Sequence, residues 1–436
     1  MTRRDRSPSE ARKLELAAKR RRISAKKEAR RGANEAAKIA QRWNGWQDAV
    51  FCDEGGVQRV APYSYRFEAF AKGRWFGRTA VDVLTDEFKA YSPSYFREAL
   101  KSGRVLVNER KVDDASVFAS GDQLVHICHR HEPPVRNELR VVRRDEERIV
   151  VDKPSSLPVH PCGRYRFNSV VYVLSRTHKV QALPVHRLDR LTSGVLVLAL
   201  NASAARSIGD QIQAHTVSKH YLARVKGEFP LQTATKSEGP ALFSSFEVPS
   251  EIIVDQNPSW VLCDEPLVCV NKRVGKFDVG AGGKESRTEF RRLSYNGRTS
   301  VVLCRPLTGR THQIRVHLRA LGFPIANDPS YGGKLCRGNT VLETRPCDAA
   351  VVDAFERRVR AEVDEICPEC SHNNEQYIPA DPHTKGELYC SEIWLHAICY
   401  AGDGWSESVP PPSWAMPDFD DENYLKDVDP NSLEPV

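Results

Sequence analysis

No run of apolar residues in this chain is long enough to span a lipid bilayer, and the first residues, MTRRDRSPSEARK, lack the apolar core of a secretory signal. The twelve cysteines do not show the compact spacing of a disulfide framework. We therefore expect free thiols, a reducing compartment and no membrane partner. With 436 residues, the chain is long enough for two domains with terminal extensions, and it contains no internal repeat.

Basic residues are concentrated at one end of the chain. Residues 1–32 contain thirteen Lys and Arg against four Asp and Glu. We predict that residues 1–45 form a basic arm, either a solvent-exposed helix or a disordered segment. Such an arm either contacts RNA or directs nuclear import, and a purely solubilising role is the alternative.

Acidic residues bear on localisation and on the C-terminus. The acids Glu10, Glu15 and Glu28 are unusual for a mitochondrial presequence, which is poor in acidic residues. We therefore expect a cytoplasmic or nuclear protein rather than a mitochondrial one. Residues 417–436 contain one Lys and seven acids, so we predict an acidic tail at residues 401–436.

A small α/β unit is predicted at residues 74–131. Ser92 or Ser94 can cap an amphipathic helix, and short alternating strands follow around Val105–Val107 and Leu124–Ile127. This order resembles the S4-type RNA-binding module. Four basic residues around one turn would suit contacts with phosphate: Arg97, Lys101, Arg104 and Arg110. The alternative is a small adaptor with ordinary surface charge.

A longer segment, residues 137–400, follows the linker HEPPV. It alternates short strands with helical stretches, which predicts one mixed α/β (α+β) domain. From about residue 333 to 389 the pattern becomes irregular and charged, as expected for an insertion. The stretch from Leu231 to Lys284 is also longer than a minimal core needs, and it can reshape the entrance for a substrate.

Charge is concentrated directly before a buried strand in the stretch HRLDRLTSG. Asp189 lies between Arg187 and Arg190, ahead of Val195–Leu200, a short apolar segment typical of a strand. Three further stretches combine polar and apolar residues: VVDKPSSLPVHP at 150–161, SKHYLARVKGEF at 218–229 and LTGRTHQIRVHLRALGFPIANDPSYGG at 307–333. Each alone has an ordinary explanation, such as a turn cap, a core aromatic residue or an amphipathic helix at Thr311–Ala320.

Six stretches occur in an order that is characteristic of one enzyme family: VDKPSSLPVHP, HRLDRLTSG, KHYLARVKG, GRTHQIRVHL, DPSYGG and WLHAICY. With them the chain resembles the RNA pseudouridine synthases of the RluA type over about residues 141–400. The resemblance implies a catalytic domain with a central mixed, largely antiparallel sheet. An S4-like module in front of it is a common attachment in that family. The implied function is isomerisation of uridine to pseudouridine in RNA.

Residues 61–84, APYSYRFEAFAKGRWFGRTAVDVL, further resemble the eukaryotic branch that modifies position 32 of the tRNA anticodon loop. We therefore expect tRNA as the partner. Two alternatives remain: an RluA-type enzyme that acts on ribosomal or other RNA, and an inactive RNA-binding protein of the same fold. The presence of Asp189, Tyr221 and Arg315 favours an active enzyme.

The resemblance assigns Asp189, Tyr221 and Arg315 as catalytic residues. Asp189 is the carboxylate, which acts either as a nucleophile on sugar or base or as a base that forms a glycal intermediate. Arg315 is its expected partner, with Arg310 as second choice. Tyr221 would stack on the extruded uracil, and its hydroxyl could help to remove the C5 proton.

Cationic residues near these positions are expected to bind the substrate. They are Arg187, Arg190, Lys219, Arg310 and His312 in the catalytic domain, and Arg97, Lys101 and Arg104 in the module. His186 and His312 are expected to be structural or to contact RNA rather than to act as bases. Because isomerisation involves no net redox change, we expect no cofactor, including no nucleotide cofactor. We also expect a monomer.

The cysteines near the C-terminus raise the question of a zinc site. Cys367 and Cys370 in CPEC have the spacing of a ligand pair, and four possible ligands lie downstream: His372, Cys390, His396 and Cys399. No second CxxC follows, and His396 lies in WLHAICY, which is expected to be a core strand. The H-x-E and P-C-x-x-C sequences of zinc deaminases are absent. We therefore predict no metal site, with zinc on the CPEC pair as the alternative.

Overall fold

The computed structural model describes residues 43, 45–54, 56–88, 91–231, 247–255, 259–271, 275–334, 349–361, 363–367, 370 and 392–426. The basic arm predicted at residues 1–45 lies outside these ranges, except for Trp43 and Gly45. Trp43 is anchored to the main domain, because its indole N–H donates to the Ala182 carbonyl at 2.7 Å. No helix within the described ranges is long and apolar enough to cross a membrane.

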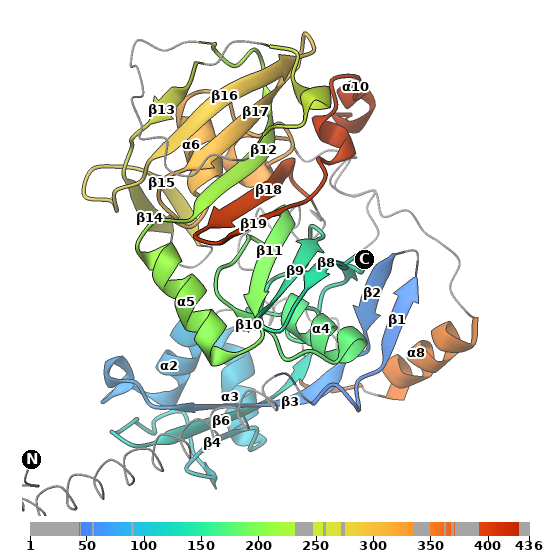
Figure 1. The fold of residues 1–436 in the computed structure, drawn as a ribbon. Helices are drawn as coiled ribbons and strands as arrows, with labels where there is room; N and C mark the ends of the chain where they lie inside the picture. Colours follow the sequence, from blue (N-terminus) through green and yellow to red (C-terminus); the bar gives the residue numbers. More distant parts are fainter. Residues whose placement is uncertain are drawn as a thin grey trace, which may run out of the picture.

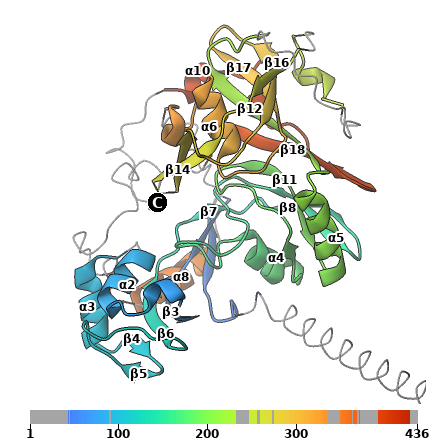
Figure 2. The ribbon, with the colours of Figure 1, turned by 90° about the vertical axis from the view of Figure 1, so that its left-hand side faces the viewer.

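Residues 63–130 form a separate unit, which we call the N-terminal module (Figures 1 and 2). Its four strands are, in spatial order, β3 (Tyr63–Phe70), β6 (Gln123–Arg130), β4 (Val105–Val107) and β5 (Arg110–Lys111). Two helices, α2 (Ala80–Glu87) and α3 (Pro93–Lys101), complete a core of its own that includes Phe96 and Leu124.

The local predictions for this module are confirmed at its helix cap and strands. The Ser92 hydroxyl accepts the backbone N–H of Tyr95 at 3.2 Å and caps α3. Strands β4 and β6 lie where alternation predicted them. The sheet begins before the predicted start at Arg74, because β3 pairs with β6 along its whole length.

The main sheet has ten strands within the described ranges. Its path is β13 (Val261–Cys263), β16 (Thr288–Tyr295), β17 (Thr299–Pro306), β12 (Ser218–Lys226), β18 (Leu395–Gly402), β11 (Ser193–Ala199), β9 (Arg148–Lys153) and β8 (Arg140–Arg144), with β10 (Leu183–Pro184) on β11 and β19 (Trp405–Ser408) on β18. Every pairing is antiparallel except that of β11 with β18. The predicted α+β class with a mixed, largely antiparallel sheet is confirmed.

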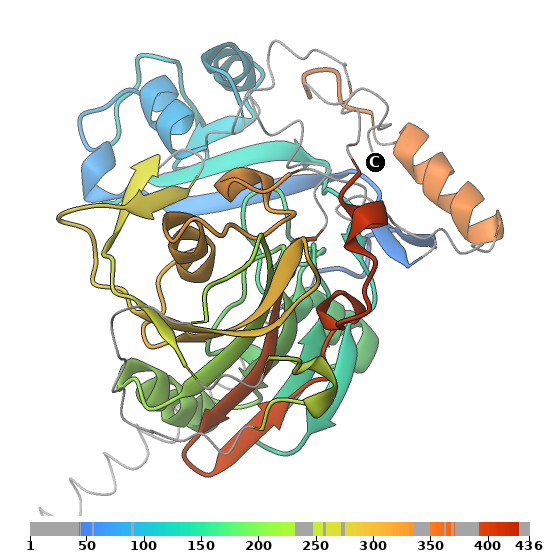
Figure 3. The ribbon, with the colours of Figure 1, turned by 90° about the horizontal axis from the view of Figure 1, so that it is seen from above.

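Three helices pack against this sheet. They are α4 (Val170–His178), α5 (Ala202–Gln213) and α6 (Gln313–Ala320). The side chain of Asn201 caps α5 by accepting the Ala204 N–H at 2.8 Å. Helix α6 lies against β16 and β17, on the same side of the sheet as the N-terminal module (Figures 2 and 3).

The parallel pairing of β11 with β18 requires a glycine. The two strands pair through Ser193 with His396 and Gly194 with Ala397. A Cβ on residue 194 would lie 2.1 Å from the Ala397 carbonyl oxygen, and Gly194 has φ +111°. No other residue fits this position. The glycine at the end of HRLDRLTSG therefore allows the turn that carries Asp189 to lie beside β18.

Smaller elements complete the fold. A three-stranded sheet contains β1 (Phe51–Glu54), β2 (Val57–Val60) and β7 (Val135–Arg136), and a hairpin contains β14 (Leu267–Asn271) and β15 (Lys276–Val279). Helix α8 (Ala349–Ala361) lies beside β1 (Figure 1). The short helices are η1 (Gly73–Trp75), η2 (Ser250–Ile252), η3 (Pro329–Tyr331), η4 (Ser413–Ala415) and α10 (Asp421–Tyr424).

The linker HEPPV is held in place by a buried carboxylate. Glu132 accepts the backbone N–H groups of Arg166, Phe167 and Asn168 at 2.8, 2.9 and 2.8 Å. It also accepts the hydroxyl of Tyr63 at 2.6 Å. Because Tyr63 belongs to β3 and the three amides belong to the main domain, Glu132 fixes the N-terminal module against that domain.

The acidic tail predicted at residues 401–436 is wrong for its described part, residues 401–426. Strand β18 continues to Gly402 and pairs with β19, and the side chains of Trp405 and Trp414 are buried. These apolar residues fold the segment onto the main sheet. Two acids of the segment, Glu407 and Asp421, are also buried and pair with arginines elsewhere in the domain.

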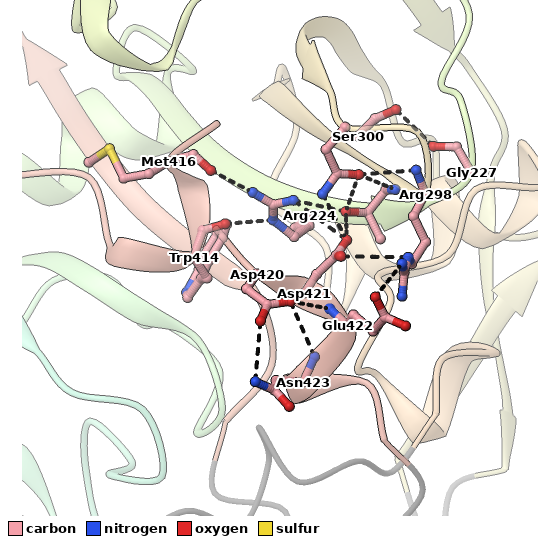
Figure 4. Close-up of polar contacts among 12 residues, drawn as sticks. Arg224, Gly227, Arg298, Ser300, Trp414, Met416, Asp420, Asp421, Glu422 and Asn423 are labelled. Carbon is pink, nitrogen blue, oxygen red and sulfur yellow. Dashed lines mark hydrogen bonds and ion pairs between the residues drawn. The ribbon is translucent and has the colours of Figure 1, made fainter. Parts of the chain in front are cut away.

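Arg224 of β12 organises that contact (Figure 4). Its guanidinium donates to the carbonyls of Trp414 and Met416 at 2.5 and 2.8 Å and lies 3.8 Å from the buried carboxylate of Asp421. It also donates to the Thr299 hydroxyl at 2.8 Å. Residues 401–426 are thus part of the main domain.

Candidate active site

A cavity of about 300 Å³ opens between the turn before β11, the start of β12, the end of β18 and the N-terminus of α6. That volume is at the lower end for small-molecule sites and suits a single nucleoside. The polar and aromatic residues that line it include Arg187, Asp189, Lys219, Tyr221, Arg310, His312, Arg315 and Tyr400. Seven of the eight site residues predicted for the catalytic domain line this cavity, and only Arg190 does not.

Asp189 is the only acid among the described residues that line the cavity. It lies in the turn between β10 and β11, and its side chain is 21% exposed, so substrate can reach it. Its backbone carbonyl accepts the Thr192 N–H at 3.1 Å, which closes the turn. The turn therefore holds one carboxylate at a defined place in an otherwise cationic cavity.

The backbone next to Asp189 is held by Lys153, which sequence reasoning missed. The Lys153 ammonium is fully buried and donates to the carbonyls of Pro154, Leu157 and Arg190 at 2.7, 2.8 and 3.2 Å. It thus links the VDKPSS stretch to the residue that follows Asp189. The sequence signal for this role was a lysine at the end of the apolar strand VVDK. Lysine is almost never fully buried unless it has partners, so a lysine next to a buried strand is expected to have them.

Arg315 lies between two carboxylates. It donates to Asp328 through Nε at 2.6 Å and through Nη2 at 2.9 Å, and its Nη1 is 3.8 Å from Asp189 Oδ2. Burial opposes the charge on Arg315, but Asp328 and Asp189 raise its pKa above the ordinary value. Arg315 therefore presents a permanent positive charge to Asp189.

Asp328 was missed by the sequence analysis, which quoted DPSYGG without assigning its aspartate. It is fully buried, caps η3 by accepting the Ser330 N–H at 3.1 Å, and forms the shorter contacts with Arg315. Arg310, the second choice as partner of Asp189, instead donates through Nε to the Glu285 carbonyl at 3.0 Å and is exposed at the cavity mouth.

His312 also faces Asp189. It precedes α6 with φ 57°, and its Nε2 lies 3.7 Å from Asp189 Oδ2. Its Nδ1 forms a hydrogen bond of 2.8 Å with the Tyr331 hydroxyl, which accepts the Phe277 N–H at 3.2 Å. The Tyr331 hydroxyl therefore holds the His312 ring with Nε2 directed toward Asp189.

Two tyrosines form the aromatic wall of the cavity. The hydroxyls of Tyr221 and Tyr400 are hydrogen-bonded, and their ring centroids are 6.0 Å apart. Burial, with Tyr400 beside it, raises the pKa of Tyr221 well above its ordinary value. The Tyr221 hydroxyl is therefore neutral at physiological pH. Tyr400 was missed, although it ends the quoted stretch WLHAICY.

His186 supports this wall. Its ring stacks on Tyr400 at 4.5 Å between centroids, and its Nε2 accepts the Val197 N–H at 3.0 Å. Burial and the nearby charge of Lys219 lower the pKa of His186 to about 3, so the ring is neutral. This arrangement agrees with the structural role expected for His186.

The remaining predicted RNA-binding residues divide into three groups. Arg187 is exposed at the cavity, and Lys219 is half-buried in it, where burial lowers its pKa. Arg190 lies outside the described lining, and its guanidinium is 5.6 Å from the centre of the Tyr165 ring. In the N-terminal module, Arg97 and Lys101 are exposed on α3.

Arg104 differs from the other predicted phosphate ligands. It forms an ion pair with Asp364, a residue of the predicted insertion, and its side chain is 30% exposed. The positive charge of Arg104 is therefore largely compensated by Asp364. The sequence gives no local signal for this pair, because the two residues lie 260 positions apart.

One carboxylate among cations, beside an aromatic wall, suits chemistry on a nucleoside within a polyanion. A family model described as RNA pseudouridylate synthase matches residues 147–320. The human pseudouridylate synthase RPUSD2 is 35% identical, over 84% of this chain and 75% of that protein. The chain belongs to the RluA-type family of RNA pseudouridine synthases, which isomerise uridine to pseudouridine in RNA.

Two yeast relatives are also similar along most of the chain. The mitochondrial tRNA pseudouridine(32) synthase of Saccharomyces cerevisiae is 35% identical, over 83% of this chain and 75% of that protein. The tRNA pseudouridine(31) synthase of the same organism is 34% identical, over 80% of this chain and 92% of that protein.

The first of these yeast relatives corrects the expected localisation. We ranked a mitochondrial location below a cytoplasmic or nuclear one because of the acids Glu10, Glu15 and Glu28. A relative that is mitochondrial by name overturns that ranking. Targeting signals are recognised by import receptors rather than through the fold, and three acids in a strongly basic arm are too weak a signal to exclude import.

Proposed function

We propose that this enzyme isomerises uridine in the anticodon loop of tRNA, at position 32, with Asp189 as the catalytic carboxylate. The observation that carries the catalytic assignment is the place of Asp189, the one acid lining the described cavity, 3.8 Å from the permanent cation of Arg315. The tRNA target is supported by the similarity to the yeast tRNA pseudouridine(32) synthase. Residues 61–84 carry the same resemblance.

The reaction breaks the C–N glycosidic bond, turns the base and forms a C–C bond to the same sugar carbon. Asp189 acts either by attacking sugar or base or by removing a sugar proton to give a glycal, and both routes need an ionised carboxylate. The Arg315 guanidinium presents its positive charge to this carboxylate from 3.8 Å. Atoms and electrons are conserved overall, so the reaction requires no redox or nucleotide cofactor.

Tyr221 holds the extruded base. Its ring is part of the cavity wall, where it can stack on uracil, and its neutral hydroxyl can relay a proton to or from the base through Tyr400. Because Tyr221 is neutral, it acts as a hydrogen-bond partner in the free enzyme. Removal of the C5 proton by Tyr221 then requires another group to take a proton from its hydroxyl.

RNA phosphates are bound by the basic residues in and around the cavity. Arg187, Arg310 and Lys219 line the cavity, and Arg190 lies next to Asp189 in the chain. In the N-terminal module, which we assign as an S4-like RNA-binding unit, Arg97 and Lys101 lie four residues apart on one exposed face of α3. We further propose that the enzyme is a monomer.

The experiment uses anticodon stem-loops that differ at single positions. Uridine is kept at position 32, at position 31 or at neither, and pseudouridine is mapped at each position after reaction with the wild type and with Asp189→Asn. Product only at position 32, absent with Asp189→Asn, is expected. Product at position 31, product only in ribosomal RNA, or equal reaction with fully paired RNA would overturn the assignment of the target.

A further inference from the structure

Four side chains of metal-binding type meet between the N-terminal module and the CPEC segment. They are His129, His131, Cys367 and Cys370, and one ligand atom from each lies within 4.8 Å of the others. His129 Nδ1 and His131 Nε2 are 3.2 Å apart. The Cys370 sulfur lies 3.3 Å from each of these nitrogens. The cluster shares no residue with the described lining of the catalytic cavity.

The three separations among His129, His131 and Cys370 are close to the edges of a tetrahedron around one metal ion. With Zn–N bonds of about 2.05 Å and Zn–S bonds of about 2.3 Å, tetrahedral angles place two nitrogens about 3.3 Å apart and a nitrogen and a sulfur about 3.6 Å apart. The observed 3.2 and 3.3 Å need only small adjustments. Two Cys and two His form the donor set of structural zinc sites.

We propose that His129, His131, Cys367 and Cys370 bind a structural Zn²⁺ ion. Four protein ligands complete a tetrahedral shell and leave no open position, which is the mark of a structural rather than a catalytic site. A cluster with two irons would separate its ligand pairs around two centres. The four ligand atoms here all lie within 4.8 Å of one another.

Local structure places both halves of the site. His129 is the second-last residue of β6 and His131 directly follows the strand, so extended backbone directs both rings to the same side. On the other half, Asp364 accepts the Ile366 N–H at 3.1 Å through its carboxylate and the Cys367 N–H at 3.1 Å through its carbonyl. The ion pair of Asp364 with Arg104 holds this turn against the N-terminal module.

The ion would connect parts of the chain that are far apart in sequence. Cys370 is 239 residues from His131. His131 precedes Glu132, the carboxylate that fixes the N-terminal module against the main domain. Zinc therefore stabilises the place where the module, the linker and the predicted insertion meet. A metal that closes such a long loop restricts the unfolded chain most strongly.

This inference departs from our prediction of no metal, which considered ligands downstream of CPEC. His396 lies in β18, where its Nδ1 forms a hydrogen bond of 2.9 Å with the Ser193 hydroxyl. Cys399 is buried in the same strand. His372 and Cys390 lie outside the described residues. The histidines that complete the site come from upstream, in HRHEPP, and no spacing rule links them to CPEC.

The test measures bound metal in the full chain. Protein is purified under reducing conditions without chelator, and its metal content is measured by elemental analysis and native mass spectrometry. About one zinc per chain is expected for the wild type, and below about 0.2 for Cys370→Ser and for His131→Asn. Two control variants, Cys269→Ser in β14 and His178→Asn at the end of α4, should keep the wild-type content.

Cobalt substitution keeps the test decisive if a variant fails to fold. Co²⁺ added to metal-free wild type should give the visible bands of a tetrahedral ion and thiolate-to-cobalt charge transfer, and Zn²⁺ should displace it. The proposal would be overturned if the wild type contained no zinc after purification and bound neither Co²⁺ nor Zn²⁺ when they were added. Iron in place of zinc, a Cys367–Cys370 disulfide in freshly reduced protein, or full zinc content in Cys370→Ser would also overturn it.

Discussion

Arg315 binds Asp328 through two nitrogens and presents its third to Asp189, 3.8 Å away. The buried aspartate therefore orients the guanidinium, while the partly exposed aspartate is left accessible to substrate. One carboxylate positions the cation and the other is available for chemistry.

Asp328→Asn should weaken both stability and turnover. Breaking a buried pair leaves Arg315 without its main counter-charge, which costs about 3–5 kcal/mol of unfolding free energy. Arg315 is then free to turn toward Asp189, and we expect the single-turnover rate to fall by more than about tenfold, or about 1.4 kcal/mol of barrier. Denaturant unfolding and single-turnover assays measure the two effects.

The matched control for this variant is Asp278→Asn. Asp278 pairs with Arg319 of the same helix, α6, but both side chains are about one-third exposed. Such a pair contributes at most about 1 kcal/mol. Equal losses in the two variants would contradict a special role for the buried Asp328–Arg315 pair.

Gly194→Ala should disrupt the pairing of β11 with β18. The new Cβ would lie 2.1 Å from the Ala397 carbonyl oxygen at a φ of +111°, so the backbone must move. We expect a loss of about 2–4 kcal/mol in unfolding free energy and a loss of activity, since the turn with Asp189 moves too. Gly209→Ala is the control. Its Cβ meets nothing within 4 Å in α5, and it should be neutral or stabilising by up to about 1 kcal/mol.

Sequence patterns predicted the elements whose signals are local. The Ser92 cap, the strand after Gly194 and the helix that became α6 each depend on residues within one turn or one alternating run. The order of the family motifs then identified Asp189, Tyr221 and Arg315, which do line one cavity. The separation of these residues along the chain does not show that they meet in space. The family resemblance was therefore needed to assign them to one site.

Contacts between distant segments could not be predicted in this way. The pairs of Arg315 with Asp328 and of Tyr221 with Tyr400 join different elements, and only the fold determines which polar groups meet. For the same reason Arg104 was predicted to bind phosphate, although it forms an ion pair with Asp364. In residues 401–426, the number of acidic residues led to the prediction of a tail. The buried tryptophans instead determine the structure of this segment.

His186 should make the protein less stable at mildly acidic pH. The unfolded pKa of histidine is about 6.5 and burial lowers that of His186 to about 3 in the folded protein, so only the unfolded chain takes up this proton between those values. The stability it contributes is present above about pH 6.5 and is lost as the pH falls toward 3, at no more than about 1.4 kcal/mol per pH unit.

The measurement is the unfolding free energy of His186→Gln between pH 7 and pH 5. Glutamine can still accept the Val197 N–H, and it does not titrate, so the variant should lose less stability on acidification than the wild type. His178→Gln, at an exposed position on α4, should behave like the wild type. A wild-type slope in His186→Gln would contradict the buried, neutral state of this ring.

Removal of residues 1–32 should weaken RNA binding without changing the chemistry. The segment carries thirteen Lys and Arg, and fewer counterions are released from RNA when it is absent. We expect weaker binding and a shallower dependence of log K on log salt concentration, with a nearly unchanged single-turnover rate at saturating RNA. An unaltered salt dependence would leave only a role in localisation for this arm.

Asp189→Asn tests the residue on which the mechanism depends. Asparagine has nearly the same shape, so the turn before β11 should keep its fold, while the charge and the nucleophile are removed. RNA binding should persist or tighten, because a negative charge leaves a cationic cavity. The exposed Asp210→Asn in α5 controls for the change in net charge. Neither stacking by Tyr221 nor extrusion from the loop can break the glycosidic bond, so pseudouridine formation should fall below detection. A single-turnover rate within about tenfold of wild type, or about 1.4 kcal/mol of barrier, would mean that another group is the catalyst.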